Sequence, residues 1–237
     1  MSQLNNLKKD LRKFKRPEKA KFLKRFFKTG KGEYAEGDFF LGLMTDETRG
    51  VAKKYLDLNF SDLERLLSSK IHEERVVALM ILSKKFDKAD KSERKKIYDF
   101  YLKNIGGVNN WDLVDGSASN IIGKYLFESK ASRQFLFDFA RSENLWKRRI
   151  AMMSTFFYIK QNDFQDALRI SEILLNDKHD LIHKAVGWML REIGNRDLNV
   201  EEGFLRKYYK KMPRTMLRYA IEKFPEGRRK KYLESKI

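Results

Sequence analysis

A short helical pattern recurs along this chain and limits the folds that it can adopt. Four segments carry a basic residue, then a β-branched or aromatic residue, then a small one, and the small residues are Ala78, Ala151, Gly187 and Ala220. Their separations are 73, 36 and 33 residues, so the first gap is about twice the others. A further copy is therefore expected near residue 115, where the segment NNWDLVDGSAS occupies residues 109–119.

A period in the mid-thirties with paired helices is typical of a stacked α-solenoid of the HEAT or tetratricopeptide kind. Small residues at one register let neighbouring helices approach closely. The chain contains only 3 prolines and 13 glycines, which also favours helices. We predict an all-α fold, a curved α-solenoid of HEAT-like hairpins that forms one domain over residues 1–237.

Local signals place the individual helices. An apolar stripe at helical spacing predicts an amphipathic helix over residues 3–15, and Pro17 suits the first turn of a second helix that ends at Phe27. Three glycines in residues 28–38 predict a loop. Two capped helices are expected next, one over 46–58 capped by Thr45 and one over 62–69 capped by Ser61. A further helix is expected over 73–86. The charged residues 84–96 are expected to form an exposed turn that contains no functional site.

The positive charge of the chain lies at its two ends. The formal net charge is +18, of which residues 1–32 carry +10 and residues 203–237 carry +9. The remaining residues balance at −1. Two basic ends suit contacts with the phosphates of a nucleic acid, and we expect the concave face of the solenoid to be basic. An anionic membrane surface is the competing partner, which the basic amphipathic helix over residues 3–15 would contact.

Composition excludes several kinds of site. The chain has no cysteine, which rules out disulfides, thiolate metal sites and a cysteine nucleophile. His179 and His183 are spaced as metal ligands on a helix, but no third ligand accompanies them. Phosphate-binding and dinucleotide-binding glycine motifs are missing as well. We expect no metal and no cofactor, and a soluble cytoplasmic protein without a membrane span or a signal peptide.

The copy near residue 115 departs from the others because Asp115 stands where they carry alanine or glycine. Trp111 and Asp115 are spaced i,i+4 on one helix face, which Asn109 or Asn110 would cap. One repeat later come Arg148 and Arg149, and one repeat after these comes Trp188. Equivalent positions of a solenoid line up along one surface, so these side chains are expected to meet. Indoles and a carboxylate stabilise positive charge, and an arginine binds phosphate.

Each of these residues also has a structural interpretation. Both tryptophans could be core aromatics, and the two arginines could be a solvated pair. Asp115 could be the buried partner of an arginine. Asp112 is best explained as a first-turn acid that the helix dipole favours.

Four segments carry a family resemblance: FFKTGKGEYAEGDFFLGLMTDETR (26–49), NNWDLVD (109–115), ENLWKRRIA (143–151) and HKAVGWMLREIG (183–194). In this order they resemble the AlkD-like DNA alkylation repair enzymes, which are alkylpurine DNA glycosylases built from HEAT-like repeats. The resemblance implies that Trp111 and Trp188 contact the deoxyribose of the lesion, that Asp115 is the catalytic carboxylate, and that Arg149 contacts a phosphate. Arg148 has no assigned counterpart, and Phe26 stands where the family has tyrosine.

The implied activity is hydrolysis of the N-glycosidic bond of cationic lesions, such as 3-methyladenine and 7-methylguanine, in duplex DNA during base excision repair, without base flipping. The expected partner is double-stranded DNA with alkylated bases, bound by a monomer and not at a membrane. The alternative is a non-catalytic HEAT-like-repeat protein that binds damaged or structured nucleic acid, because related proteins can keep a fold and lose an activity.

Overall fold

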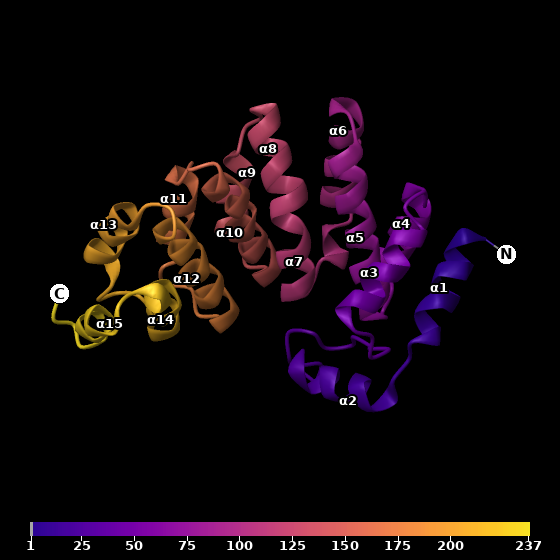
Figure 1. Cartoon of the computed structure of the whole chain (residues 1–237), viewed down its shortest axis with the longest axis horizontal. Helices are drawn as coiled ribbons and strands as arrows, with labels where there is room; N and C mark the ends of the chain where they lie inside the picture. Colours follow the sequence, from indigo (N-terminus) through magenta and orange to yellow (C-terminus); the bar gives the residue numbers. More distant parts are fainter. Residues whose placement is uncertain (1) are drawn as a thin grey trace. The chain divides into compact units, whose positions relative to one another are not determined.

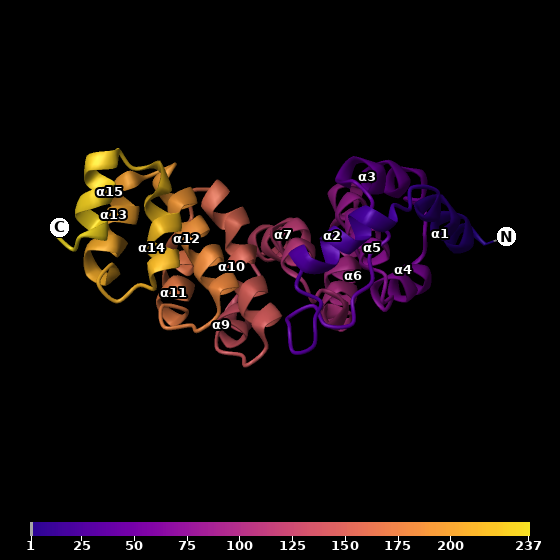
Figure 2. The ribbon, with the colours of Figure 1, turned by 90° about the horizontal axis from the view of Figure 1, so that it is seen from below.

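The computed structural model describes residues 2–237, which are helical and contain no strand beyond an isolated bridge between Phe39 and Ile71. The chain divides into two compact units, Met1–Ser117 and Ala118–Ile237, and each is described by itself. Figures 1 and 2 show that both consist of helices, with a long loop between α2 and α3 in the first unit. Over this described stretch, no helix is both long and apolar enough to cross a membrane.

The first unit is built around α5. Its helices are α1 (Gln3–Lys13), α2 (Pro17–Phe26), α3 (Thr45–Lys54), α4 (Phe60–Leu67), α5 (His72–Lys88), α6 (Lys91–Lys103), the short η1 (Ile105–Gly107) and most of α7 (Trp111–Ala118). Helices α3, α4 and α6 all pack against α5, and α1 packs against α3 and α5. Leu4, Leu7 and Leu11 of α1 are buried, which confirms the amphipathic stripe read from the sequence.

The second unit is a stack of helical hairpins. Its helices are the π-helical η2 (Ser119–Gly123), α8 (Lys124–Ser129), α9 (Gln134–Ala140), α10 (Leu145–Lys160), α11 (Gln165–Ile173), α12 (Asp180–Gly194), α13 (Leu198–Tyr208), α14 (Arg214–Ala220), η3 (Ile221–Lys223) and α15 (Glu226–Leu233). Helix α12 packs between α10 and α14, which forms one layer of the stack, and α9, α11 and α13 are the other halves of the hairpins (Figure 1).

Small residues fill the contacts between repeat helices, as the spacing predicts. Ala78, Ala151 and Ala220 are fully buried, and Gly187 faces the backbone of α14. In the copy near residue 115, a buried alanine lies about one helical turn after the expected position. Ala118 is fully buried there, whereas Asp115 is only half-buried.

Three predicted boundaries are wrong, two of them because a local hydrogen bond fixes the start of the helix elsewhere. The helix expected over 46–58 ends at Lys54 and begins after Met44, whose N–H donates to the Glu47 carboxylate at 2.8 Å. Asn59, and not Ser61, caps α4, since its Oδ1 accepts from the Asp62 N–H at 2.9 Å. Most of the predicted turn over 84–96 is helical, because only two residues separate α5 from α6.

A single carboxylate fixes the end of the loop that follows α2. Glu73 is buried in the first turn of α5 and accepts hydrogen bonds from the N–H groups of Leu41, Gly42 and Leu43 at 2.8–3.3 Å. Gly42 has a φ of +91°, and a Cβ there would lie 2.4 Å from the Arg16 carbonyl oxygen, so the position requires glycine. This loop end therefore has a defined conformation without a sheet.

Candidate active site

Helix α7 carries two of the three residues expected to act on the lesion, Trp111 and Asp115. Trp111 opens the helix and Asp115 follows one turn later, so both lie on one face as the spacing predicts. The Trp111 N–H donates to Asn110 Oδ1 at 2.8 Å, which provides the expected asparagine at the helix start. Both side chains are half-buried, so each keeps a surface toward solvent.

Trp111 rests on a stack of aromatic rings. Its indole lies parallel to Phe27, with ring centroids 5.2 Å apart and an interplanar angle of 14°. Phe27 stacks on Phe40 at 5.0 Å, and Phe40 stacks on the imidazole of His72 at 4.6 Å. Phe27, Phe40 and His72 are buried, so the inner face of Trp111 is fixed by close packing. Trp111 therefore has both a structural role and an accessible ring.

The same stack is closed by hydrogen bonds. His72 Nε2 lies 2.7 Å from Asp112 Oδ2, and its Nδ1 lies 3.4 Å from Asp38 Oδ2. Arg75 donates to Asp38 at 2.6 Å. Burial of the ring lowers the pKa of His72, but Asp112 and Asp38 raise it more, so the net pKa lies above the ordinary value of 6.5. When His72 is protonated, Asp112 forms an ion pair with it, in addition to being the first-turn acid expected from the sequence.

A polar cavity of about 480 Å³ adjoins this network in the first unit. Asp38, Arg75, Lys70 and Asn109 are among the residues that line it. Arg75 Nε and Asn109 Oδ1 are buried atoms without a hydrogen-bond partner in the described part of the chain. Such atoms commonly bond to ordered water, and a polar cavity of this size has room for it.

The two predicted phosphate ligands lie in the second unit, on α10. Arg149 is only 4% exposed, and its guanidinium donates to the carbonyl oxygen of Leu181. Arg148 donates from Nε to Asp177 at 2.6 Å and from a terminal nitrogen to backbone carbonyls. Both arginines therefore connect α10 to the start of α12 within the protein, and the interpretation as a solvated pair is wrong.

Trp188 lies on α12 of the same unit and is half-buried. Its Nε1 donates to Glu192 at 3.2 Å, and its ring lies 5.8 Å from that of Phe156. The Lys160 ammonium stands 4.0 Å from the Phe156 ring centroid. Burial, with a contribution from Arg196, lowers the pKa of Lys160. The tryptophan thus adjoins an aromatic and cationic pair that the sequence patterns did not single out.

Sequence comparison assigns the chain to a protein family. Residues 7–224 match the family described as DNA alkylation repair enzyme. The chain belongs to this family. No curated protein matches it significantly.

Two solved structures align with this chain and share its fold. A predicted DNA alkylation repair enzyme from Enterococcus faecalis aligns with a TM-score of 0.67 at 16% identity, covering 90% of this chain and 97% of the other. AlkD2 from Streptococcus mutans aligns with a TM-score of 0.54 at 17% identity, covering 88% and 98%. Together with the helical-hairpin architecture, they confirm the predicted AlkD-like, HEAT-like fold class.

Within this family member, the site residues fall into two groups. Trp111 and Asp115 share α7, whereas Arg148, Arg149 and Trp188 share the α10 and α12 pair. Their meeting on one surface stays a prediction. Sequence analysis missed the His72–Asp112 pair because 40 residues separate its members and nothing in the sequence around His72 points to Asp112.

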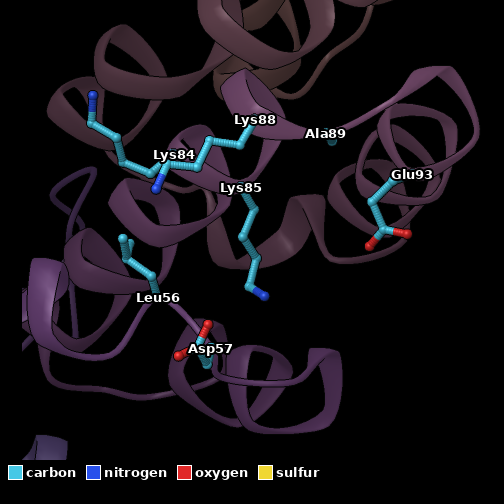
Figure 3. A pocket seen from close by; sticks show the side chains of 7 residues that line it. All are labelled: Leu56, Asp57, Lys84, Lys85, Lys88, Ala89 and Glu93. Atoms are coloured by element: carbon cyan, nitrogen blue, oxygen red, sulfur yellow. The ribbon is translucent and has the colours of Figure 1, made fainter.

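The two predicted histidines of this repair-family chain adjoin the partners of Arg148 and Arg149. His183 Nε2 lies 2.5 Å from the Asp177 carbonyl oxygen, and His179 Nδ1 accepts from the Leu181 N–H at 3.1 Å. Among residues 2–237, no group of three or more histidine or acidic side chains is arranged to hold a metal. A cavity of about 230 Å³ lies where α5 ends. Its lining residues, shown in Figure 3, are Leu56, Asp57, Lys84, Lys85, Lys88, Ala89 and Glu93.

Proposed function

We propose that this protein is a monofunctional DNA glycosylase that hydrolyses the N-glycosidic bond of positively charged alkylated purines, such as 3-methyladenine and 7-methylguanine, in duplex DNA. The observation that carries the proposal is the pairing on α7 of a half-exposed carboxylate, Asp115, with a half-exposed indole, Trp111, that is fixed from behind. Membership of the DNA alkylation repair enzyme family supports the choice of substrate.

The chemistry fits a site that lacks a dedicated general acid. Alkylation of a ring nitrogen leaves the purine positively charged, so the base departs as a neutral molecule when the bond to the sugar breaks. The charge that develops is on the deoxyribose, which becomes oxocarbenium-like. A carboxylate held beside that position stabilises the charge, and Asp115 has this role. The same carboxylate orients the attacking water, whose oxygen bonds to the anomeric carbon; the departing base keeps the electron pair of the broken bond, and the added water releases one proton to solvent.

The aromatic residues stabilise the same cation. An indole face carries negative electrostatic potential and attracts a cation within about 6 Å of its centroid. Trp111 offers one such face, since Phe27 covers the other. Trp188 is proposed to offer a second face from α12. With the sugar as the recognised group, the enzyme acts on the backbone side of the lesion and needs no pocket for a flipped base.

Arg149 and Arg148 are proposed to contact the phosphates around the lesion, which requires the buried Arg149 guanidinium to turn outward from the Leu181 carbonyl oxygen. Arg149→Ala is then expected to weaken DNA binding and to reduce the slope of log affinity against log salt by about 0.9, the value for one phosphate contact. An unchanged salt slope would assign Arg149 to the packing of α10 on Leu181 alone.

The decisive experiment measures base release from N-methylated duplex DNA by mass spectrometry. Wild type is expected to release 7-methylguanine or 3-methyladenine, and Asp115→Asn is expected to bind the DNA but lose most of the release, because the substitution keeps the shape and removes the charge. Asp99→Asn is the matched control, since Asp99 lies on the exposed face of α6, where its carboxylate pairs with Lys95.

Equal release by wild type and Asp115→Asn would contradict the assigned role of the carboxylate. Salt-dependent DNA binding without any base release would instead support a non-catalytic HEAT-like-repeat protein that binds damaged or structured nucleic acid. The absence of both binding and release would overturn the DNA-directed function while leaving the fold intact.

A further inference from the structure

The polar cavity of the first unit has no part in the catalytic proposal. Its volume is about 480 Å³, and its walls come from the loop between α2 and α3, the α4–α5 and α6–α7 connections, and the first turn of α5. Neither Trp111 nor Asp115 lines it. Arg75 of its wall contacts Nδ1 of His72, whereas Asp112 bonds to Nε2 on the other side of that ring. The cavity is therefore distinct from the surface that Trp111 and Asp115 share.

Arg75 gives this cavity a buried donor that the protein itself does not use. Its side chain is only 3% exposed, and its two terminal nitrogens donate to the Ser69 carbonyl oxygen at 2.7 Å and to the Asp38 carboxylate at 2.6 Å. Its Nε is buried and, across residues 2–237, has no hydrogen-bond partner. Because both terminal nitrogens are held, the direction of the Nε–H is fixed before any ligand binds. A buried donor of this kind calls for an acceptor.

Two lysines give the same cavity additional positive charge. Lys70 and Lys103 both line it, and both are exposed. Lys103 pairs with Glu64 at 3.2 Å, whereas Lys70 has no ion pair within the described part of the chain. Guanidinium and ammonium groups are the ones with which proteins bind phosphate. Arg75 and Lys70 therefore each contribute a donor to one anion site.

Hydrogen-bond acceptors line other parts of the cavity. Asn109 Oδ1 is buried and has no partner among the described residues. Glu36 is exposed, and its Oε2 accepts from the Gly32 N–H at 2.8 Å. Hydroxyl groups are donors that suit these oxygens, whereas the Glu36 carboxylate would repel a second anionic group on the ligand.

The cavity is larger than a phosphate ion. At about 30 Å³ for each water-sized atom, it holds about 16 non-hydrogen atoms, so the five atoms of a phosphate ion fill only about a third of it. Leu67 is the one apolar side chain among the described residues that line it, and no aromatic ring accompanies Leu67. The remainder of the ligand is therefore expected to be hydroxylated, and not a nucleobase or a lipid chain.

We propose that this cavity binds a small phosphorylated polyol or sugar, a phosphate monoester whose oxygens accept hydrogen bonds from Arg75 Nε and the Lys70 ammonium and whose hydroxyl donates to Asn109 Oδ1. The inference goes beyond the proposed glycosylase activity, since it requires neither DNA nor base release. A terminal nitrogen of Arg75 lies 3.3 Å from His72 Nδ1, so a ligand on Arg75 changes the surroundings of that ring.

Isothermal titration calorimetry of the full chain tests the proposal with myo-inositol 1-phosphate, which has no aldehyde that could react with lysine. Inositol and inorganic phosphate are titrated separately at the same ionic strength. Wild type is expected to bind the inositol phosphate more tightly than either part. Lys70→Gln should weaken binding of both phosphates about 10-fold, the loss of one hydrogen bond to a charged group. Asn109→Ala should weaken binding of the inositol phosphate by about 2- to 10-fold and leave inorganic phosphate unchanged, because the polyol hydroxyl is the group that donates to Asn109.

Lys84→Gln is the matched control, because Lys84 is also exposed but lines the other cavity of the first unit, at the far end of α5 (Figure 3). An equal loss in this variant would overturn the site, as would no binding of the inositol phosphate at millimolar concentration. Inorganic phosphate that binds as tightly as the inositol phosphate would refute the hydroxyl contact and with it the class of ligand.

NMR of the histidine rings locates the binding. The inositol phosphate should shift the ring signals of His72 and leave those of His179 and His183, which lie in the second unit, unchanged. Unchanged His72 signals at saturation would place the ligand elsewhere and overturn the proposal. Displacement of the inositol phosphate by unmodified duplex DNA would assign the phosphate to a DNA backbone in place of a free ligand. Base release without inositol phosphate binding refutes the cavity site alone and leaves the proposed function standing.

Discussion

Gly187→Ala tests how the close approach of two repeat helices positions Trp188. A Cβ at Gly187 would lie 2.4 Å from the Met216 carbonyl oxygen and 2.5 Å from the Cβ of Tyr219, both on α14. Neither atom can rotate away, because one is backbone and the other is fixed to it. To restore an ordinary 3.4 Å contact, α12 and α14 must separate by about 1 Å.

The magnitude follows from that displacement. Overpacking of a well-packed contact costs about 1–3 kcal/mol, so the free energy of unfolding should fall by this amount. Trp188 is the next residue on α12 and moves with the helix. A misplacement of about 1 Å at a reacting centre can reduce a rate by about 100-fold, so base release should fall by roughly 10- to 100-fold while the chain remains folded.

Urea unfolding and base release from methylated duplex DNA together check this prediction. Gly203→Ala is the matched control, because Gly203 is exposed within α13 of the same unit and a Cβ there meets nothing within 4 Å. That variant should be more stable by about 0.5–1 kcal/mol, since alanine favours a helix over glycine, and its base release should not change. The reasoning is refuted if Gly187→Ala is as stable and as active as Gly203→Ala.

Three further predictions concern buried groups. Burial and the neighbouring Glu202 raise the pKa of Glu201 from 4.5 to about 8, so the folded state holds a proton that the unfolded chain releases. The free energy of unfolding should therefore fall as the pH rises from about 4.5 to about 8, and urea titrations of Glu201→Gln should lack that fall. Because the pKa of His72 is raised in the folded state, its ion pair with Asp112 is complete below pH 6.5 and is lost as the pH rises through the folded-state pKa. Wild-type base release should therefore decline over that rise in pH, and base release by His72→Asn should show no such decline. Gly42→Ala should reduce the urea midpoint by the equivalent of about 1–3 kcal/mol, because it adds a Cβ against a carbonyl oxygen at a positive φ.

Periodicity predicted the helices well, because the apolar residues that a helix buries recur at helical spacing within its own sequence. The α1 stripe, the proline at the start of α2 and the small residues of the repeat helices all appear as expected. The boundaries failed where a competing side chain was nearby, as with Asn59 in place of Ser61. The charged segment 84–96 looked like a turn because its charges are exposed, yet exposed charges are equally compatible with helix ends.

The candidate site was predictable only where it is local. Trp111 and Asp115 lie four residues apart, so their shared face follows from helix geometry. The surroundings of these residues depend on tertiary packing: His72 reaches Asp112 from another helix, and Leu181 holds the Arg149 guanidinium inside the second unit. A repeat period aligns backbone positions and does not determine which side chains become buried.

The anchoring of the loop end by Glu73 has a practical consequence for protein engineering. Because Leu41, Gly42 and Leu43 are fixed from α5, the segment between α2 and this end is not required to define their conformation. Gly32, at a φ of +75° and with open space around it, lies at an exposed turn of that segment. A reporter peptide or a fluorophore-labelled cysteine could be inserted there, close to α2 in sequence, as a probe of DNA engagement that leaves the helical stack undisturbed.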